Sequence, residues 1–170
     1  MKIAEAEKIA QKYLELFKPH CERIEIAGSI RRGKAEVNDI EIVCIPKTHK
    51  VVYNMFDEID ERDNEFVKLV HRIPRVKGDG LGKYIQFLLP ENIKLDMFTA
   101  TPRNWGYILA IRTGSAYFSH NTLAKGWRRA GYKGNGGMLE DEYGNEVEVK
   151  EEIDLFHLIG LPFVKPEARL

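Results

Sequence analysis

The sequence predicts an α+β fold: a mixed sheet with flanking helices, followed by a small α/β lobe. Three observations support it. A long amphipathic helix opens the chain, short segments of strand-like alternation follow, and the charge pattern changes after Met97. No Asp or Glu occurs from Met97 to Leu139, whereas residues 140–154 are rich in both. The second half of the chain therefore divides into an acid-free segment and an acidic one.

Composition narrows the class of protein. The 170 residues are 44% hydrophobic, which suffices for a sizeable core. A formal net charge of zero argues against a nonspecific coat for nucleic acid, while a local basic surface stays open. Cys21 and Cys44 are too few for a disulfide frame or zinc site, and we expect both to be buried. No apolar run approaches the roughly 18 residues of a membrane span and no signal peptide is evident, so we expect a cytoplasmic protein.

The first elements follow from hydrophobic spacing. Apolar residues at helical intervals predict a packing helix over Ile3–Phe17, which Pro19 ends. Strands are predicted at Arg23–Ala27 and Asp39–Ile45, on either side of a turn at Gly28–Lys34.

The next stretch is less uniform. Spacing of i, i+3, i+4 and i+7 predicts a short helix over Val51–Ile59, and Phe66–Val76 fits either a helix or a strand. The Gly-rich run Lys77–Lys83 lacks the spacing of a dinucleotide-binding loop and is expected to be a hairpin loop. Strands are predicted at Tyr84–Leu89 and Ile93–Phe98.

The α/β lobe begins with helices. One is predicted over Asn104–Thr113 and another over Tyr117–Ala130. Small strands with Gly-rich turns should occupy Tyr132–Val149, and a last short helix Ile153–Ile159. The residues expected to face inward from the second helix are Leu123, Trp127 and Ala130.

Residues 27–43 carry most of the polar chemistry. Asp39 and Glu41 are two apart on a predicted strand, so their side chains share one face. Mg²⁺ prefers carboxylates together with phosphate oxygens. The turn before them offers free backbone N–H groups, the Ser29 hydroxyl and the Arg32 guanidinium, which suit a polyphosphate. The alternative is an ordinary strand with a solvated acidic face; a third acid, Asp96, on a later predicted strand favours the metal site.

This pattern resembles the active-site signature of the family X DNA polymerases, the group of DNA polymerase beta. That signature is Gly-Ser, an Arg-Arg-Gly turn and an Asp-x-Asp or Asp-x-Glu pair, with a third carboxylate on a later strand. The resemblance implies a nucleotidyltransferase palm over residues 1–103 and a thumb over 104–170, joined at Thr113-Gly114-Ser115. It extends over nearly the whole chain, in the minimal palm-plus-thumb form known among viral members.

The resemblance also assigns roles. Asp39 and Glu41 would hold the nucleotide-bound metal and share the catalytic one, and Asp96 would complete the catalytic site and accept the primer hydroxyl's proton. Two Mg²⁺ ions are implied, with Mn²⁺ as a substitute. Lys94 matches a basic position that pairs with these carboxylates, although a solvated strand end fits equally, and Arg31 is left a structural role such as an ion pair between lobes. The implied nucleotide-binding residues are Gly28, Ser29, Arg32, Gly114 and Ser115.

Two positions depart from the family pattern. The aromatic pair that commonly precedes Thr-Gly-Ser is Ile111 and Arg112 here, which leaves sugar discrimination open and allows Arg112 to contact phosphate or template. Glu41 replaces the more common Asp, which keeps the ligand type and lengthens the side chain by one methylene.

The acid-free stretch predicts a phosphate-backbone footprint, with internal pairing to the acidic segment after it as the alternative. Three functions remain. The first is a DNA-directed DNA polymerase that fills short gaps as a monomer, with gapped or primer–template DNA and nucleoside triphosphates as partners. The second is a template-independent or small-molecule nucleotidyltransferase, and the third a catalytically idle nucleic-acid-binding module. The predicted DNA-binding residues are Arg112, Lys125, Arg128, Arg129 and Lys133.

Overall fold

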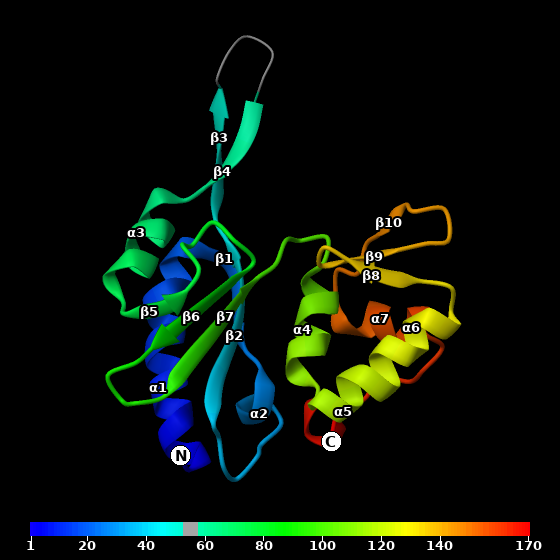
Figure 1. Ribbon diagram of the computed structural model, residues 1–170, viewed down its shortest axis with the longest axis horizontal. Helices are drawn as coiled ribbons and strands as arrows, with labels where there is room; N and C mark the ends of the chain where they lie inside the picture. Colours follow the sequence, from blue (N-terminus) through cyan, green and yellow to red (C-terminus); the bar gives the residue numbers. More distant parts are fainter. Residues whose placement is uncertain (53–57) are drawn as a thin grey trace.

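The computed structural model describes residues 1–52 and 58–170, with side chains described outside residues 50–60 (Figure 1). Two lobes lie side by side, and we name them the N-terminal lobe (residues 1–103) and the C-terminal lobe (residues 104–170). The protein is α+β, as predicted. No helix among the described residues is both long enough and apolar enough to span a membrane.

A mixed five-stranded sheet forms the N-terminal lobe, in the order β1-β2-β7-β6-β5. The central pair β2 and β7 is parallel, and the other neighbours are antiparallel. The predicted hairpin across the Gly-rich run is confirmed, because β5 and β6 pair on either side of it. The strand bounds are β1 Cys21–Ile26, β2 Asp39–Pro46, β5 Arg75–Lys77, β6 Tyr84–Leu88 and β7 Lys94–Thr99.

One face of this sheet packs against two helices. The amphipathic α1 (Ile3–Phe17) and α3 (Asn64–Arg72) bury their apolar stripes on β2, β6 and β7. The alternation of β2 explains its part, since Ile40 and Ile42 are fully buried on this side. Cys21 and Cys44 belong to the same core, as predicted.

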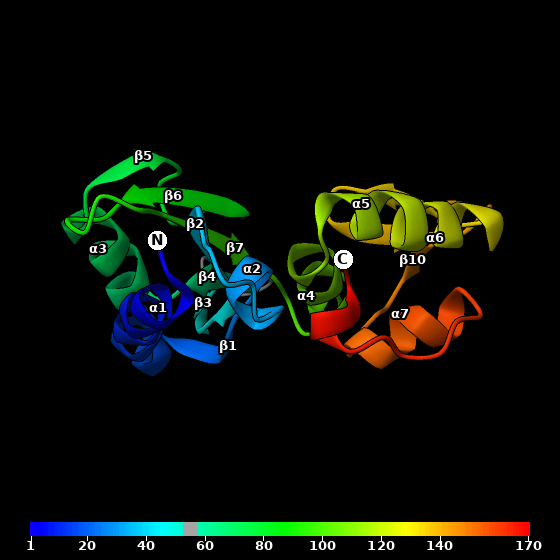
Figure 2. The ribbon, with the colours of Figure 1, turned by 90° about the horizontal axis from the view of Figure 1, so that it is seen from below.

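The other face is covered only in part. Towards the end of β2, Val43 and Ile45 pack under Trp105 and Leu109 of α4 (Trp105–Thr113), which begins the C-terminal lobe. Figure 2 shows α1 and α3 on one side of the sheet and α4 with the short α2 (Gly28–Arg31) on the other. α4 therefore leaves the start of β2 uncovered on this face, which is where polar side chains can lie.

Two predictions in the N-terminal lobe change. The helix predicted over Val51–Ile59 is wrong where the chain is described, because β3 (Thr48–Val52) and β4 (Glu58–Arg62) pair as an antiparallel ribbon that projects from the lobe (Figure 1). Residues 53–57 of that prediction lie outside the described residues. The segment Phe66–Val76, open between helix and strand, divides into α3 and β5, with Pro74 between them.

The C-terminal lobe packs its helices on a small three-stranded sheet, with the apolar cluster of Trp127, Leu139 and Phe156 between them. The helix predicted over Tyr117–Ala130 is interrupted by a π-helical segment, Ser119–Ala124. Ala130 is exposed rather than inward, because the helix ends at Arg129. The remaining bounds are α5 Ala116–Phe118, α6 Lys125–Arg129, β8 Lys133–Asn135, β9 Met138–Glu140, β10 Glu146–Val147, α7 Glu152–Leu158 and the 3₁₀ turns Lys18–His20 and Pro166–Ala168.

Candidate active site

Three carboxylates gather on the partly covered face of the sheet. Parallel pairing of β2 and β7 places Glu41 directly opposite Asp96, and Asp39 opposite the exposed Lys94. Asp39 and Glu41 share the face because they are two residues apart, and Asp96 shares it through the register. The acids predicted from two distant segments are thus neighbours.

Asp96 is held in place by the adjacent strand. The Tyr84 hydroxyl and the Gln86 amide nitrogen of β6 each donate to Asp96 Oδ1, both at 2.8 Å. These donors fix the carboxylate through one oxygen and leave the other without a hydrogen bond from the described residues. Burial, together with the hydrogen bond to Asp96 and its charge, raises the pKa of Tyr84 to about 12.

The electrostatics of the cluster favour a cation. Burial, followed by the charge of Asp39, raises the pKa of Glu41 to about 7, against the pull of Arg112 and Arg32. Burial and the charge of Asp96 likewise raise the pKa of Asp39. Two arginines nearby do not compensate the carboxylates, so an additional positive charge would stabilise their ionised forms.

The carboxylates do not form a finished metal site. Within the described part of the chain, no group of three or more His, Cys, Asp and Glu side chains converges closely enough to hold an ion. Their oxygen chemistry nevertheless fits Mg²⁺ or Mn²⁺. Asp39, Glu41 and Asp96 would hold such ions after side-chain rotation on a shared face.

Gly28 lets the turn before the site approach Glu41. Its φ of +62° lies in the left-handed region, and a Cβ there would fall 2.0 Å from Glu41 Oε2. The Ala27 amide also donates to the Glu41 backbone oxygen at 2.8 Å. The glycine is therefore required both by its backbone conformation and by the acid beside it.

The predicted nucleotide-binding residues lie on both sides of the joint between the lobes. Arg32 donates from Nη1 to the Thr113 carbonyl at 2.7 Å, next to Gly114 and Ser115. The Ser29 hydroxyl and Arg32 Nε are buried without a hydrogen-bond partner among the described residues. Ser115 caps α5 by accepting from the Phe118 amide at 3.0 Å, which occupies one of the acceptor positions of its hydroxyl. The turn therefore has two polar groups without a partner among the described residues, the Ser29 hydroxyl and Arg32 Nε, whereas the Ser115 hydroxyl already accepts one hydrogen bond.

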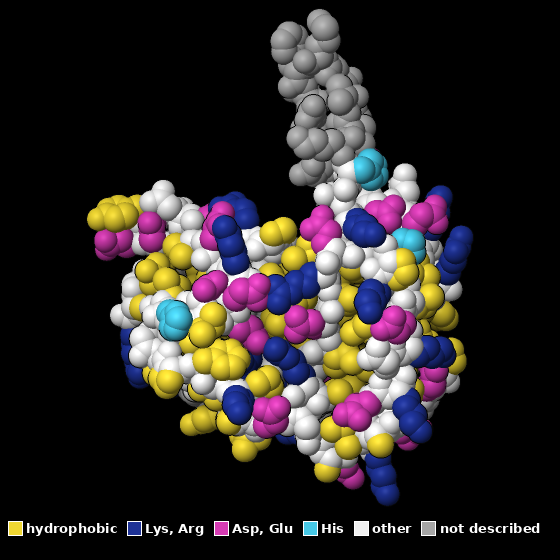
Figure 3. All heavy atoms as spheres, turned by 180° about the vertical axis from the view of Figure 1, so that it is seen from behind, with side chains coloured by type: hydrophobic (Ala, Val, Ile, Leu, Met, Phe, Trp, Pro, Cys, Tyr) yellow, Lys and Arg dark blue, Asp and Glu magenta, His cyan; other side chains and the backbone are white. Residues whose placement is uncertain are grey.

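Ion pairs join the lobes behind the turn. Arg31 of α2 donates to both oxygens of Glu152 of α7, at 2.9 and 2.7 Å, and to Thr113 Oγ1 at 2.7 Å. Glu152 also accepts from Arg169, which is fully buried. Arg23 binds Glu151 at 2.5 and 2.9 Å. The structural role expected for Arg31 is confirmed, and Figure 3 shows that positive and negative side chains are interspersed on the face behind Figure 1.

The cations of the acid-free stretch have different environments. The Arg103 guanidinium pairs with Glu146 and Glu148, and Lys133 Nζ lies 3.0 Å from Glu140, so internal pairing holds for these two. Arg112 stacks over the Phe98 ring at 3.8 Å from its centroid. The remaining three are exposed and form no ion pair or hydrogen bond with the described side chains: Lys125, Arg128 and Arg129.

Sequence reasoning missed the contacts that four residues make, either with Asp96 or across the joint between the lobes. Tyr84 and Gln86 alternate onto one strand face, and that signal was visible, but their contact with Asp96 depends on the pairing of β6 with β7. Thr113 was expected only as part of the link Thr113-Gly114-Ser115. Its contact with Arg31, and that of Glu152, cross the joint between the lobes, and no local pattern predicts such contacts.

Comparison with known proteins adds no assignment. A scan against models of protein families gives no match, and a search of curated proteins finds no related sequence.

Proposed function

We propose that this chain is a metal-dependent nucleotidyltransferase of the family X type, with a palm in the N-terminal lobe and a thumb in the C-terminal lobe. Its reaction would be DNA-directed addition of nucleotides to a primer 3′-hydroxyl, chiefly in short gaps. The observation that carries the proposal is the register that places Asp39, Glu41 and Asp96 on one face beside the Gly28–Arg32 turn.

The side chains divide the work. Asp39, Glu41 and Asp96 would hold two Mg²⁺ ions, with Mn²⁺ as a substitute. Bound there, the metals would supply charge neutralisation and lower the pKa of the attacking hydroxyl. Asp96, which accepts hydrogen bonds from Tyr84 and Gln86, would accept that hydroxyl's proton.

Substrate positioning falls to the turn and to the thumb. The unpartnered Ser29 hydroxyl and Arg32 Nε are donors that triphosphate oxygens would satisfy. The unpaired Lys125, Arg128 and Arg129 would contact the DNA backbone, whereas Lys133 must first leave Glu140.

A one-nucleotide-gapped duplex tests this function. We expect incorporation with Mg²⁺ of the nucleotide complementary to the templating base, when each is supplied alone. Equal incorporation of all four would support a template-independent transferase instead, and no transfer to any acceptor would remove the proposal.

Asp96→Asn is the variant that should lose nucleotide incorporation while keeping the fold. The amide oxygen can still accept from Tyr84 and Gln86, so the fold should persist while incorporation falls by about two orders of magnitude or more. Glu91→Gln, which changes an acid whose ion pair is with Lys12, should leave incorporation near the original rate. Duplex binding measured alongside separates chemistry from substrate binding.

A further inference from the structure

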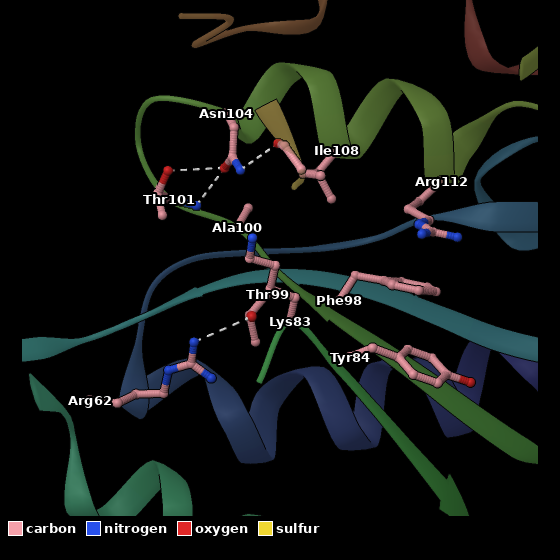
Figure 4. Close-up of a pocket in the computed structure, with 11 residues that line it drawn as sticks. Arg62, Lys83, Tyr84, Phe98, Thr99, Ala100, Thr101, Asn104, Ile108 and Arg112 are labelled. Atoms are coloured by element: carbon pink, nitrogen blue, oxygen red, sulfur yellow. Dashed lines mark hydrogen bonds between the residues drawn. The ribbon is translucent and has the colours of Figure 1, made fainter. Parts of the chain in front are cut away.

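A cavity of about 300 Å³ lies between the lobes, beyond the carboxylate cluster along β7 (Figure 4). Residues 98–100 of β7 and the loop after it form one wall, and α4 forms the other with Ile108 and Arg112. Arg62, at the base of the β3–β4 ribbon, stands at the end opposite Arg112. The cavity therefore touches the N-terminal lobe, the ribbon and the C-terminal lobe.

Positive charge lines this cavity, and the carboxylates that act on its cations electrostatically, Glu41 and Asp79, lie outside the lining. Its charged lining residues are Arg62, Lys83 and Arg112, and no Asp or Glu of the described residues belongs to the lining. The remaining polar lining includes Thr99 and Asn104. Cations around a partly open cavity attract an anion, because the low-dielectric walls weaken solvent screening.

None of the three cations forms an ion pair with an acid among the described side chains. Arg62 donates to the carbonyls of Gly80 and Gly82 and, at 3.4 Å, to Thr99 Oγ1. Burial lowers the pKa of Arg62 despite the opposing charge of Asp79, so the charged form lacks full compensation. Lys83 Nζ donates to the Gly136 carbonyl of the other lobe.

The opposite side of the same joint provides an internal comparison. There the cations Arg23, Arg31 and Arg169 are each bound by Glu151 or Glu152. At both places basic side chains bridge the lobes, yet only one place contains the acids. Among the described residues, acids form ion pairs with the cations behind the turn, whereas no acid belongs to the lining of the cavity.

We infer that this cavity binds a phosphate-bearing anion, held between Arg62 and Lys83 of the N-terminal lobe and Arg112 of the C-terminal lobe. The volume lies at the lower limit of small-ligand pockets and is large enough for phosphate or pyrophosphate. Arginine and lysine donors match phosphate oxygens in charge and geometry. A bound anion would hold the two lobes together on the side of the joint opposite the ion pairs of Glu151 and Glu152. The inference does not depend on the proposed transfer reaction.

The phosphate group can come from a free anion or from a nucleic-acid backbone. Inorganic pyrophosphate and a short single-stranded oligonucleotide are therefore titrated separately, by calorimetry and thermal unfolding, with EDTA present to remove divalent metal. Saturable binding of pyrophosphate with a raised Tm identifies a free anion. Saturable binding of the oligonucleotide alone identifies a backbone phosphate.

Lys83→Glu is the decisive variant, because it places the missing carboxylate at an exposed lining position. We expect it to weaken anion binding about tenfold or more and to abolish the rise in Tm. Arg62→Gln should weaken binding similarly, but its bonds to two carbonyls make Lys83→Glu the safer test of a folded protein.

Two controls place the anion. Lys165→Gln removes an exposed cation outside this lining and should leave pyrophosphate affinity unchanged. Arg32→Gln removes the donor of the proposed triphosphate site and should also retain binding here. If Lys83→Glu binds as the original protein does, or if Arg32→Gln alone loses binding, the inference is overturned.

Discussion

The Glu41 carboxylate lies against Gly28, so closely that a Cβ at position 28 would meet Glu41 Oε2 at 2.0 Å. The contact links the turn that carries Ser29 and Arg32 to the strand that carries two acids. A substitution of Gly28 or of Glu41 should therefore alter both the turn and the strand.

Gly28→Ala should lower both stability and transfer activity. Its left-handed φ costs an alanine roughly 1–3 kcal/mol, and the displaced Glu41 adds to this loss. Gly33→Ala is the matched control, since Gly33 has φ +69° and an added Cβ there would meet no atom within 4 Å among the described residues. Urea unfolding should give a free-energy loss at least about 1 kcal/mol larger for position 28; equal losses would mean that the contact with Glu41 has no energetic weight.

The pKa of Glu41 predicts a stability that falls with rising pH. Its folded-state value of about 7 lies above its ordinary value of 4.5, so the folded protein binds the proton more tightly than the unfolded chain. Stability should therefore decrease between about pH 4.5 and 7 and level off above, by up to about 3 kcal/mol. The raised pKa of Asp39 acts in the same direction.

Glu41→Gln checks this assignment. The neutral amide should flatten the unfolding free energy across that pH window and make the variant the more stable protein at pH 8. Mg²⁺ should offset the loss in the original protein at pH 8 and have little effect on the variant. A pH dependence that survives the substitution would assign the titration to another group.

The buried ion pairs between the lobes predict a large loss for Glu152→Ala. The substitution leaves the fully buried Arg169 without an acid and leaves Arg31 only its longer contact with Glu25 at 3.7 Å, at a cost of roughly 3–5 kcal/mol. Arg103→Ala breaks two exposed pairs and should cost less than about 1 kcal/mol. Both are measured by urea unfolding, and similar costs would show that the joint contributes no more than a surface contact.

Salt dependence distinguishes the unpaired cations from the paired ones. Replacing Lys125, Arg128 and Arg129 together by Gln should reduce the slope of log K for duplex binding against log salt by up to about 2.7. The control replaces Arg103 and Lys133, whose charges are already met by glutamates, and should change the slope far less. A larger change of slope for the control would indicate that Arg103 and Lys133, rather than the three unpaired cations, contact the DNA.

Local sequence pattern was informative where the periodicity of a single strand or helix decides which side chains share a face. Alternation predicted that Asp39 and Glu41 share a face, and the structure agrees, with Ile40 and Ile42 buried on the opposite face. The prediction over Val51–Ile59 was wrong because a few apolar residues at helical intervals do not exclude a ribbon whose strands pair with each other. Ala130 was misplaced because the helix ended one residue earlier than its spacing indicated.

By itself the sequence determined the strand faces, the acids, the turn residues and the division into an acid-free and an acidic segment, since each depends on neighbours in the chain. Tertiary structure decided which strands pair, and hence that Asp96 stands opposite Glu41. It also decided which cations are free of the described acids: Arg103 and Lys133 meet glutamates, whereas Arg128 does not. Register and ion pairing join residues distant in the chain, so they follow from packing of the whole molecule and no local period encodes them.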